Sequence, residues 1–236
     1  MVFWKCKKRL QIKKKIINNK NVATFMKNLI FEKKSKWRKA EQMFEDDKLK
    51  DFLMAASLQF ETHKSKIAKH ISLALAADLA KRQNSIGEIA PVHICLHDFL
   101  PQKHTDLIRS LTRCADALRW REAGFGKLPE KFSKRIYASE LIGPKGLFEN
   151  TQIRIGLLIQ QGQLAYPKHW HAAEELYLVL SGNAYWSIDS DPAVLYPPES
   201  FVHHKSLQPH SMTTVEEPLL ALWGWTGDIN GSSYSI

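Results

Sequence analysis

Seven short apolar segments follow one another after Asn150, and they limit the possible folds more than any other part of the sequence. In the first segment, isoleucine and leucine alternate with Arg154 and Gly156. This two-residue period, with Gly, Asn, Asp and Pro between segments, is typical of antiparallel strands joined by tight turns. The pattern predicts a sandwich or a small barrel, and a small barrel has room for one ligand and a metal ion. The segments are 153–159, 176–180, 184–188, 193–196, 201–204, 211–215 and 219–225.

A cluster of residues that can bind a metal ion precedes and enters the second segment. Side chains two residues apart on a strand point to the same side and lie roughly 6–7 Å apart. His169 and His171 therefore share one face, and Glu175 and Tyr177 share another. Imidazole and carboxylate together suit a divalent first-row metal such as Fe, Mn, Co, Ni or Zn. The fixed offset of the glutamate, and Gly182 at the end of the apolar run, favour a metal site over a histidine pair on a solvated strand edge.

This spacing, H-x-H-x3-E-x6-G beginning at His169, resembles the first motif of the cupin superfamily. The segments 166–182, 209–214 and 219–228 resemble, more narrowly, the cupin-type dimethylsulfoniopropionate (DMSP) lyases. The resemblance is strong over about the last 80–90 residues and covers the first half in outline only. It implies a mainly β fold, the cupin double-stranded β-helix or jelly-roll barrel, preceded by an α-helical region. It also implies cleavage of DMSP to dimethyl sulfide and acrylate.

Cupins supply one more histidine ligand from a later strand, and two places in this chain compete for that role. A proline–histidine pair ends at His210, although Lys205 and Leu207 replace the usual proline and glycine before it. A second pattern, P-x-S-x-x-H, ends at His203 and is followed by His204. The lyase resemblance favours His210, and His203 or His204 is the alternative.

The resemblance also implies a β-elimination with a tyrosine base. The proton next to the substrate carboxylate is weakly acidic, and a metal ion on that carboxylate would act as a Lewis acid. A base must lie within hydrogen-bond reach of this proton. Tyr177 matches a metal-proximal tyrosine and base of these lyases, and Tyr166 matches a second active-site tyrosine. A nearby cation can lower the pKa of a tyrosine from its usual value near 10.

The other end of the substrate is a sulfonium cation, which aromatic faces can bind. Such a cation–π contact contributes ~0.5–2 kcal/mol, depending on desolvation. Trp170 lies between two histidines that share a face, so its side chain is expected to point away from the site. These aromatic residues could also simply fill the core. The candidates are Trp170, Tyr185, Trp186, Trp223 and Trp225.

Residues 37–150 are expected to be a mainly helical region that packs on the barrel. Apolar residues recur at roughly helical spacing over 43–60 and 67–79, and residues 84–87 are expected to end the second helix. The helices carry no chemical motif of their own. Their expected role is to cover the barrel and help to close its mouth.

Three further segments complete the helical region. Residues 91–101 alternate in polarity and are expected to be extended, with His93 and His97 on the surface. A helix is expected from Thr105 and Asp106 to just before Gly124. Residues 127–150 contain several prolines and glycines, and they predict a linker-like passage with one short helix.

Positive charge is concentrated at the N-terminus. Residues 1–40 carry fourteen Lys and Arg against the single Glu32, a net charge of +13, so the remaining residues carry 10 − 13 = −3. We therefore divide the chain into a basic extension (1–36), the helical region (37–150) and the barrel (151–236). A solvated tail is the expectation for the extension, with binding to an anionic membrane surface or nucleic acid as the alternatives. Met26 is an alternative start.

Several functional classes do not fit the composition. The three cysteines match neither a disulfide framework nor a C-x-x-C zinc site, so a cytoplasmic setting is expected. The sequence has no apolar run long enough for a membrane span and no signal peptide pattern.

We expect a small sulfonium carboxylate as the substrate, no nucleic-acid partner, and an assembly compatible with a homodimer. The alternative functions are a cupin-type iron oxygenase on a small organic acid and a non-enzymatic cupin regulator.

Overall fold

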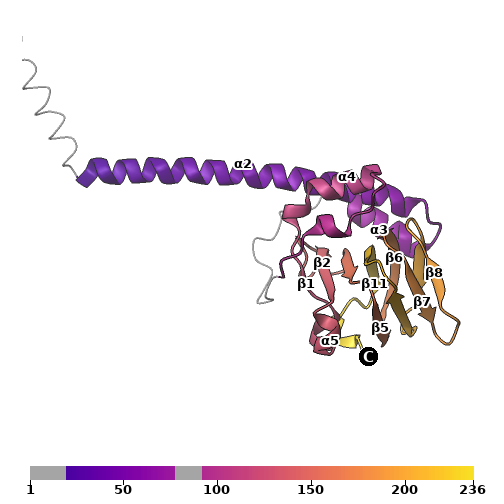
Figure 1. Ribbon diagram of the computed structural model, residues 1–236. Coiled ribbons are helices and arrows are strands. Elements are labelled where there is room, and N and C mark those ends of the chain that lie inside the picture. The colour runs from indigo at the N-terminus through magenta and orange to yellow at the C-terminus, as the bar shows by residue number, and fades with distance from the viewer. Residues whose placement is uncertain (1–19, 78–91) are drawn as a thin grey trace, which may run out of the picture. The chain divides into compact units, whose positions relative to one another are not determined.

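The strands of the barrel region pair into two sheets in the computed structural model, which describes residues 20–77 and 92–236 (Figure 1). The larger sheet has the order β1-β2-β4-β11-β6-β9 with β3 beside β2, and the smaller sheet has the order β5-β10-β7-β8. All pairs in these sheets are antiparallel except β2–β3. The larger sheet contains β1 (Arg121–Glu122), β2 (Ile136–Gly143), β3 (Phe148–Glu149), β4 (Arg154–Gln160), β6 (Ala173–Ser181), β9 (Phe201–His204) and β11 (Leu219–Gly227). The smaller sheet contains β5 (Leu164–His169), β7 (Ala184–Ile188), β8 (Val194–Tyr196) and β10 (His210–Thr214).

The larger sheet is buried on both faces, with one hydrophobic core on each side. Strand β6 shows how the sequence achieves this, because successive side chains of a strand point to opposite faces. Leu176 and Leu178 join the core beneath the helices, whereas Tyr177 and Val179 join the core between the two sheets. The second core also takes in Trp186 from the smaller sheet. The two sheets therefore enclose a barrel, and the predicted mainly β double-stranded β-helix preceded by helices is confirmed.

The helices belong to two compact units, Met1–Asp47 and Lys48–Ile236, and the barrel lies in the second. Residues 1–19 of the predicted basic extension and the predicted helix end at 84–87 lie outside the described residues. The first helix begins at Lys20, well before the expected start near Trp37. None of the described helices is long and apolar enough to cross a membrane. The helices are α2 (Lys20–Glu61), α3 (Lys66–Ala76), α4 (Asp106–Arg113) and α5 (Glu130–Ser133).

Strand β2 corrects the prediction that residues 127–150 form a linker-like passage. The short helix expected there is α5, but it is followed by a strand in which all eight residues are buried. A strand buried on both faces loses the alternation that makes strands recognisable in a sequence. Its polar residue Glu140 is buried because it pairs with two guanidinium groups, at 3.3 Å from Arg121 and 3.0 Å from Arg154.

Two further expectations for the helical region are partly correct. Thr105 caps α4, accepting a hydrogen bond from the Ile108 amide, but the helix ends at Arg113 instead of continuing towards Gly124. After α4 the chain continues through a short 3₁₀ turn to β1, which lies at the edge of the larger sheet. The segment expected to be extended contains a 3₁₀ turn at Leu96–Phe99. The two histidines of this segment are exposed, as expected.

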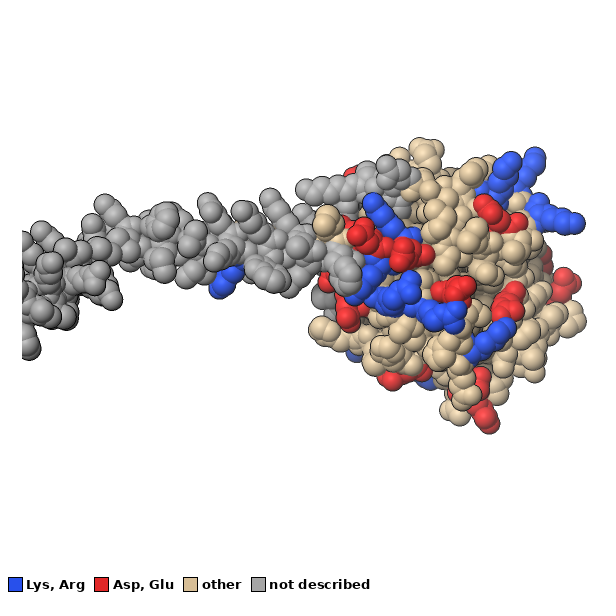
Figure 2. Space-filling view, turned by 90° about the horizontal axis from the view of Figure 1, so that it is seen from above, with Lys and Arg blue, Asp and Glu red and all other residues tan. Residues whose placement is uncertain are grey.

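Charged side chains of both signs are interspersed on the face of the barrel unit seen in Figure 2. Among the described residues, ion pairs also join different elements, for example Arg113 with Asp51 and Lys103 with Glu199. A surface of this kind lacks the single-sign patch that typically binds nucleic acid. On this face, the structure thus agrees with the net charge of −3 over residues 41–236.

The turn that joins β6 to β7 depends on Gly182. Its φ is +73°, and a Cβ there would lie 1.9 Å from the backbone oxygen of Pro218, which cannot move away cheaply. We predict that Gly182→Ala lowers the free energy of unfolding by roughly 2–5 kcal/mol, measured by chemical denaturation. Gly227→Ala is the matched control because Gly227 has a φ of +80° with no atom within 4 Å of such a Cβ. Its expected loss is ~1–2 kcal/mol, and equal losses in the two variants would contradict the steric argument.

Candidate metal centre and active site

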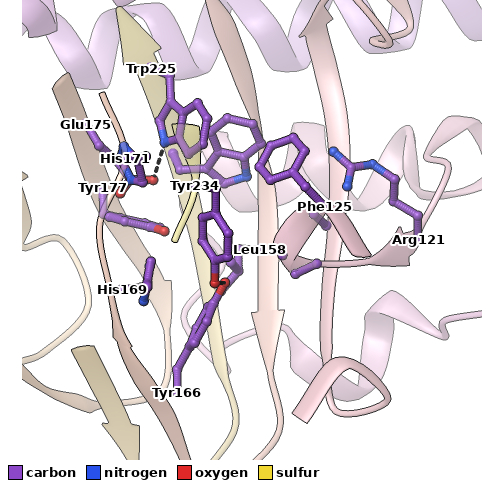
Figure 3. Close-up of a pocket in the computed structure, with 14 residues that line it drawn as sticks. Arg121, Phe125, Leu158, Tyr166, His169, His171, Glu175, Tyr177, Trp225 and Tyr234 are labelled. Carbon is purple, nitrogen blue, oxygen red and sulfur yellow. Dashed lines mark hydrogen bonds and ion pairs between the residues drawn. The ribbon is translucent and has the colours of Figure 1, made fainter. Parts of the chain in front are cut away.

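A cavity lies between the two sheets. Side chains from β4, β5, β6 and β11 line it, together with the loop around Phe125 and with Tyr234 near the C-terminus (Figure 3). Six of the lining residues are Phe, Tyr or Trp; Glu175 and two histidines lie at one end of the cavity, and Arg121 lies at the other end beside Phe125. A concave site of this kind suits a small molecule and not a polymer.

Three buried residues at the polar end bring metal-binding atoms together. The ligand atoms of His171, Glu175 and His210 all lie within 4.8 Å of one another. Oxygen Oε2 of Glu175 is 3.1 Å from Nε2 of His171 and 3.3 Å from Nε2 of His210. His171 lies between β5 and β6, Glu175 belongs to β6 and His210 begins β10, so a connecting segment and one strand from each sheet contribute. This donor set could hold a divalent metal ion.

Backbone carbonyls orient the imidazole rings at this end of the cavity. Nδ1 of His169, His171 and His210 lies 2.9, 3.0 and 2.8 Å from the backbone oxygens of Pro167, Ala173 and Gln208, respectively. A carbonyl only accepts hydrogen bonds, so each Nδ1 must carry the proton and donate it. In a neutral ring, Nε2 then keeps its lone pair and faces the cavity side of the site. This is the usual way in which proteins prepare a histidine for a metal ion.

The carboxylate of Glu175 is fixed at both oxygens. Nε1 of Trp225 donates a hydrogen bond of 2.6 Å to Oε1, which leaves Oε2 for the histidines (Figure 3). Burial alone would raise the pKa of the Glu175 carboxyl. The contacts with His171, His204 and His210 outweigh burial and hold this pKa well below its usual value. Glu175 is therefore ionised at neutral pH.

His169, which the sequence places in the metal set, is buried beside this group, but its ring nitrogens are not among the atoms within 4.8 Å. The ring stacks on Tyr166, with centroids 4.4 Å apart, and meets the His210 ring edge-on at 4.2 Å. Burial, followed by the neighbouring His210, lowers its pKa well below 6.5. The ring is therefore neutral, and its role as a ligand stays a prediction.

The two alternatives to His210 occupy opposite faces of β9. His203 lies on the outer side, partly exposed, with Nε2 2.8 Å from Glu174. His204 points into the barrel, where its ring stacks on that of His210. Leu207 adopts a φ of +60° at the position where the cupin motif has glycine, so the turn before His210 forms despite the substitution.

Both predicted tyrosines line the cavity. Tyr177 is buried near the metal-binding group, and its pKa is raised well above 10 by burial and then by the Glu175 carboxylate. The hydroxyl of Tyr166 lies 3.0 Å from that of Tyr234. Burial also raises the pKa of Tyr166 well above its ordinary value.

The predicted aromatic residues divide into two groups. Trp223 and Trp225 line the cavity, whereas Trp186 is fully buried behind Tyr177. Trp170 and Tyr185 are 37% and 41% exposed and do not line it. The expectation that Trp170 points away from the site is confirmed.

Sequence reasoning missed the part of the wall formed by Phe125 and Tyr234, which come from segments with no strand or helix signal. Phe125 has a φ of +54° between two glycines that also have positive φ, and its ring lies 5.5 Å from that of Trp225. Tyr234 is held in place because the backbones of Trp170 and Ser235 exchange two hydrogen bonds of 3.0 and 2.9 Å. The Gly-Phe-Gly sequence was the one available signal for this loop. Arg121, also in the wall, belongs to a strand too short to recognise.

Comparisons with known proteins show which family the chain belongs to. The family model for dimethylsulfoniopropionate lyase matches residues 63–221. The chain is 33% identical over 112 residues to the dimethylsulfoniopropionate lyase DddQ of Ruegeria pomeroyi, covering 47% of this chain and 56% of that protein. It is 28% identical over 177 residues to the putative dimethylsulfoniopropionate lyase DddL of Cereibacter sphaeroides, covering 72% and 74%.

A solved structure supports the same fold. The crystal structure of DddQ from Ruegeria pomeroyi matches with a TM-score of 0.63 and 23% identity, covering 81% of this chain and 96% of that one. At this identity the likeness concerns the fold, and the family rests on the sequence match, which covers more than half of the chain. The chain belongs to the dimethylsulfoniopropionate lyase family, a family of carbon–sulfur lyases with the cupin fold.

Proposed function

We propose that this protein cleaves DMSP to dimethyl sulfide and acrylate by a metal-dependent β-elimination. The observation that carries the proposal is the buried group of His171, Glu175 and His210 at one end of an aromatic cavity, beside Tyr177, in a chain of the DMSP lyase family. DMSP is a small zwitterion. Its carboxylate suits the polar end of this cavity, and its sulfonium suits the aromatic end.

The residues present fit a divalent metal ion. Nε2 of His210 is buried and has no hydrogen-bond partner among the described residues, although Oε2 of Glu175 is 3.3 Å away. An unpartnered buried acceptor is costly unless something binds it. In the proposed site, His171, Glu175 and His210 hold the ion, with His169 and Tyr177 beside it. The donor set accepts Fe, Mn, Co, Ni or Zn. When bound, the ion supplies Lewis-acid stabilisation of the charge that develops on the substrate carboxylate.

Tyr177 is the proposed base. Its oxygen takes the proton from the substrate carbon next to the carboxylate. The C–H electrons form the new double bond, and the electrons of the C–S bond leave with sulfur as neutral dimethyl sulfide. The raised pKa of Tyr177 shows that the protein alone does not favour a tyrosinate here. A cation beside the hydroxyl lowers the pKa of such a group. Tyr166 is the second choice because its hydroxyl already contacts Tyr234.

The aromatic wall is proposed to bind the sulfonium and keep water out. Trp223 and Trp225 come from one strand, and Phe125 closes the wall from the opposite loop. A cation that has lost its water against such faces gains ~2 kcal/mol or more. Dimethyl sulfide is neutral and loses this attraction once the C–S bond breaks. The wall therefore holds the substrate more tightly than the product.

The direct test is release of dimethyl sulfide from DMSP under anaerobic conditions, measured by gas chromatography. We expect release with an equal amount of acrylate, loss of release after chelation, and recovery when a single metal is restored. Elimination consumes no oxygen, so an oxygenase would fail in this assay. Absence of release with every metal tested would contradict the lyase proposal.

Tyr177→Phe tests the base. We expect kcat to fall by about 10²–10⁴, the usual contribution of a positioned proton-transfer group, with metal content retained. Tyr185→Phe, which removes a partly exposed hydroxyl outside the cavity, is the control and should keep wild-type kcat. Near wild-type turnover in Tyr177→Phe would show that another group takes the proton.

His210→Ala and His203→Ala test the last ligand. His210→Ala removes a buried donor and should lose most of the bound metal, measured by elemental analysis after reconstitution. His203→Ala changes a residue on the outer face of the same region, so its metal content should match that of the wild type. Loss of metal in the His203 variant alone would contradict the choice of His210.

A further inference from the structure

His204 is a buried histidine with no assigned function. It lies on β9, directly opposite Glu175 in the strand register, and its side chain is completely shielded from solvent. Neither ring nitrogen has a hydrogen-bond partner among the described residues. The ring is packed between aromatic neighbours, with centroids 5.6 Å from Trp186 and 5.8 Å from Tyr177. An apolar residue would fill this space without the cost of burying two polar nitrogens, so the imidazole needs another explanation.

The stacking geometry excludes His204 as a ligand alongside His210. The two rings are almost parallel, with an interplanar angle of 7° and centroids 3.8 Å apart. An ion bound by Nε2 of His210 lies in the plane of that ring. Rings in contact are about 3.5 Å apart, so the ion would lie about that far from the plane of His204. A metal–imidazole bond is only ~2.0–2.1 Å long.

The contact that remains is with Glu175. Nδ1 of His204 is 3.5 Å from Oε2, the same oxygen that approaches His171 and His210. A carboxylate oxygen has two lone pairs, so Oε2 can face a metal ion with one and accept from an N–H with the other. Oε1 is already held by Trp225. An N–H on Nδ1 of His204 would therefore contact Oε2, while Trp225 holds Oε1.

We propose that His204 is a positioning residue of the metal centre, which holds the Glu175 carboxylate through Nδ1–H and supports the ring of His210 by stacking. This inference rests on the proposed metal centre but not on the identity of the substrate. Groups that orient metal ligands typically change metal affinity by 10–100-fold when removed. The Nδ1–H donor of His204 matters more than its stacking, since a phenyl ring could supply the stacking alone.

Two substitutions separate the donor from the ring. His204→Asn places an amide N–H near the position of Nδ1 and loses most of the stacking face. His204→Phe keeps an aromatic face on His210 and removes the donor. His204→Leu provides a second variant without a donor, should phenylalanine prevent folding. His203→Asn is the matched control, one residue along the strand on the outer face.

The measurement is Co²⁺ affinity by competition with a chromophoric chelator, together with thermal unfolding of each metal-free variant to establish that it folds. We expect Kd to rise 10–100-fold in the Phe and Leu variants, to rise by less than about fivefold in the Asn variant, and to be unchanged in the His203 control. The visible Co²⁺ spectrum should keep its band positions in the Asn variant, because the ligand set is unaltered.

Three outcomes would overturn the proposal. Wild-type affinity in the Phe variant would show that Glu175 needs no donor from His204. A Co²⁺ spectrum in the Asn variant that reports the loss of one imidazole would make His204 a ligand. Absence of Co²⁺ binding in the wild type would remove the metal centre and this inference together. Failure to release dimethyl sulfide from a protein that binds Co²⁺ normally would instead affect only the choice of substrate.

Discussion

The site depends on the contacts that keep the buried carboxylate of Glu175 ionised. Removing such a charge from water is expensive unless hydrogen bonds and opposite charges replace the lost hydration. Here Trp225 donates to one oxygen, and three imidazole rings surround the other. Each of these groups comes from a different strand or loop of the barrel. The carboxylate therefore ties the larger sheet to the first residue of β10 and fixes the shape of the cavity.

This arrangement requires a sheet that is covered on both faces. Strand β6 carries Glu175 and Tyr177 towards the cavity, while Leu176 and Leu178 face the helices. The helices α3 and α4 and the end of α2 therefore support the site from the back of the sheet. Close packing continues across to α3, where a Cβ on Gly224 would lie 2.4 Å from Cδ1 of Ile71. Among the described residues, no α-helix contributes a side chain to the cavity, yet these helices pack against the strand that presents the site residues.

The sequence predicted the parts of the site that are local in the chain. His171, Glu175 and Tyr177 lie within one short stretch, and period-two spacing placed Glu175 and Tyr177 on the same face of a strand. The choice of His210 over its neighbours was harder because it depends on which face of β9 each histidine occupies. The stacking of His204 on His210 could not be foreseen, since it joins two strands of different sheets.

Other parts of the structure have no recognisable pattern in the sequence. Strand β2 is buried on both faces and contains Ser139 and Glu140, so neither alternation nor hydrophobicity marked it. Glu140 is tolerated there only because two arginines from neighbouring strands pair with it. The same applies to the cavity wall, because Phe125 depends on an unusual backbone and Tyr234 depends on contacts with distant residues. Such features arise from tertiary contacts and have no periodic signature.

Charge balance gives the final reason to expect a cation at this site. Burial lowers the pKa of His204 to about 4 and that of His169 well below 6.5, so both rings are neutral when Glu175 is ionised. The polar end of the cavity thus holds an ionised carboxylate beside two neutral rings. A divalent ion there would neutralise the carboxylate, make use of the free Nε2 of His210, and lower the pKa of Tyr177 towards the range in which it can act as a base. Such an ion would therefore act on the unpartnered imidazole nitrogen and would oppose the effect of burial and of Glu175 on the pKa of the tyrosine.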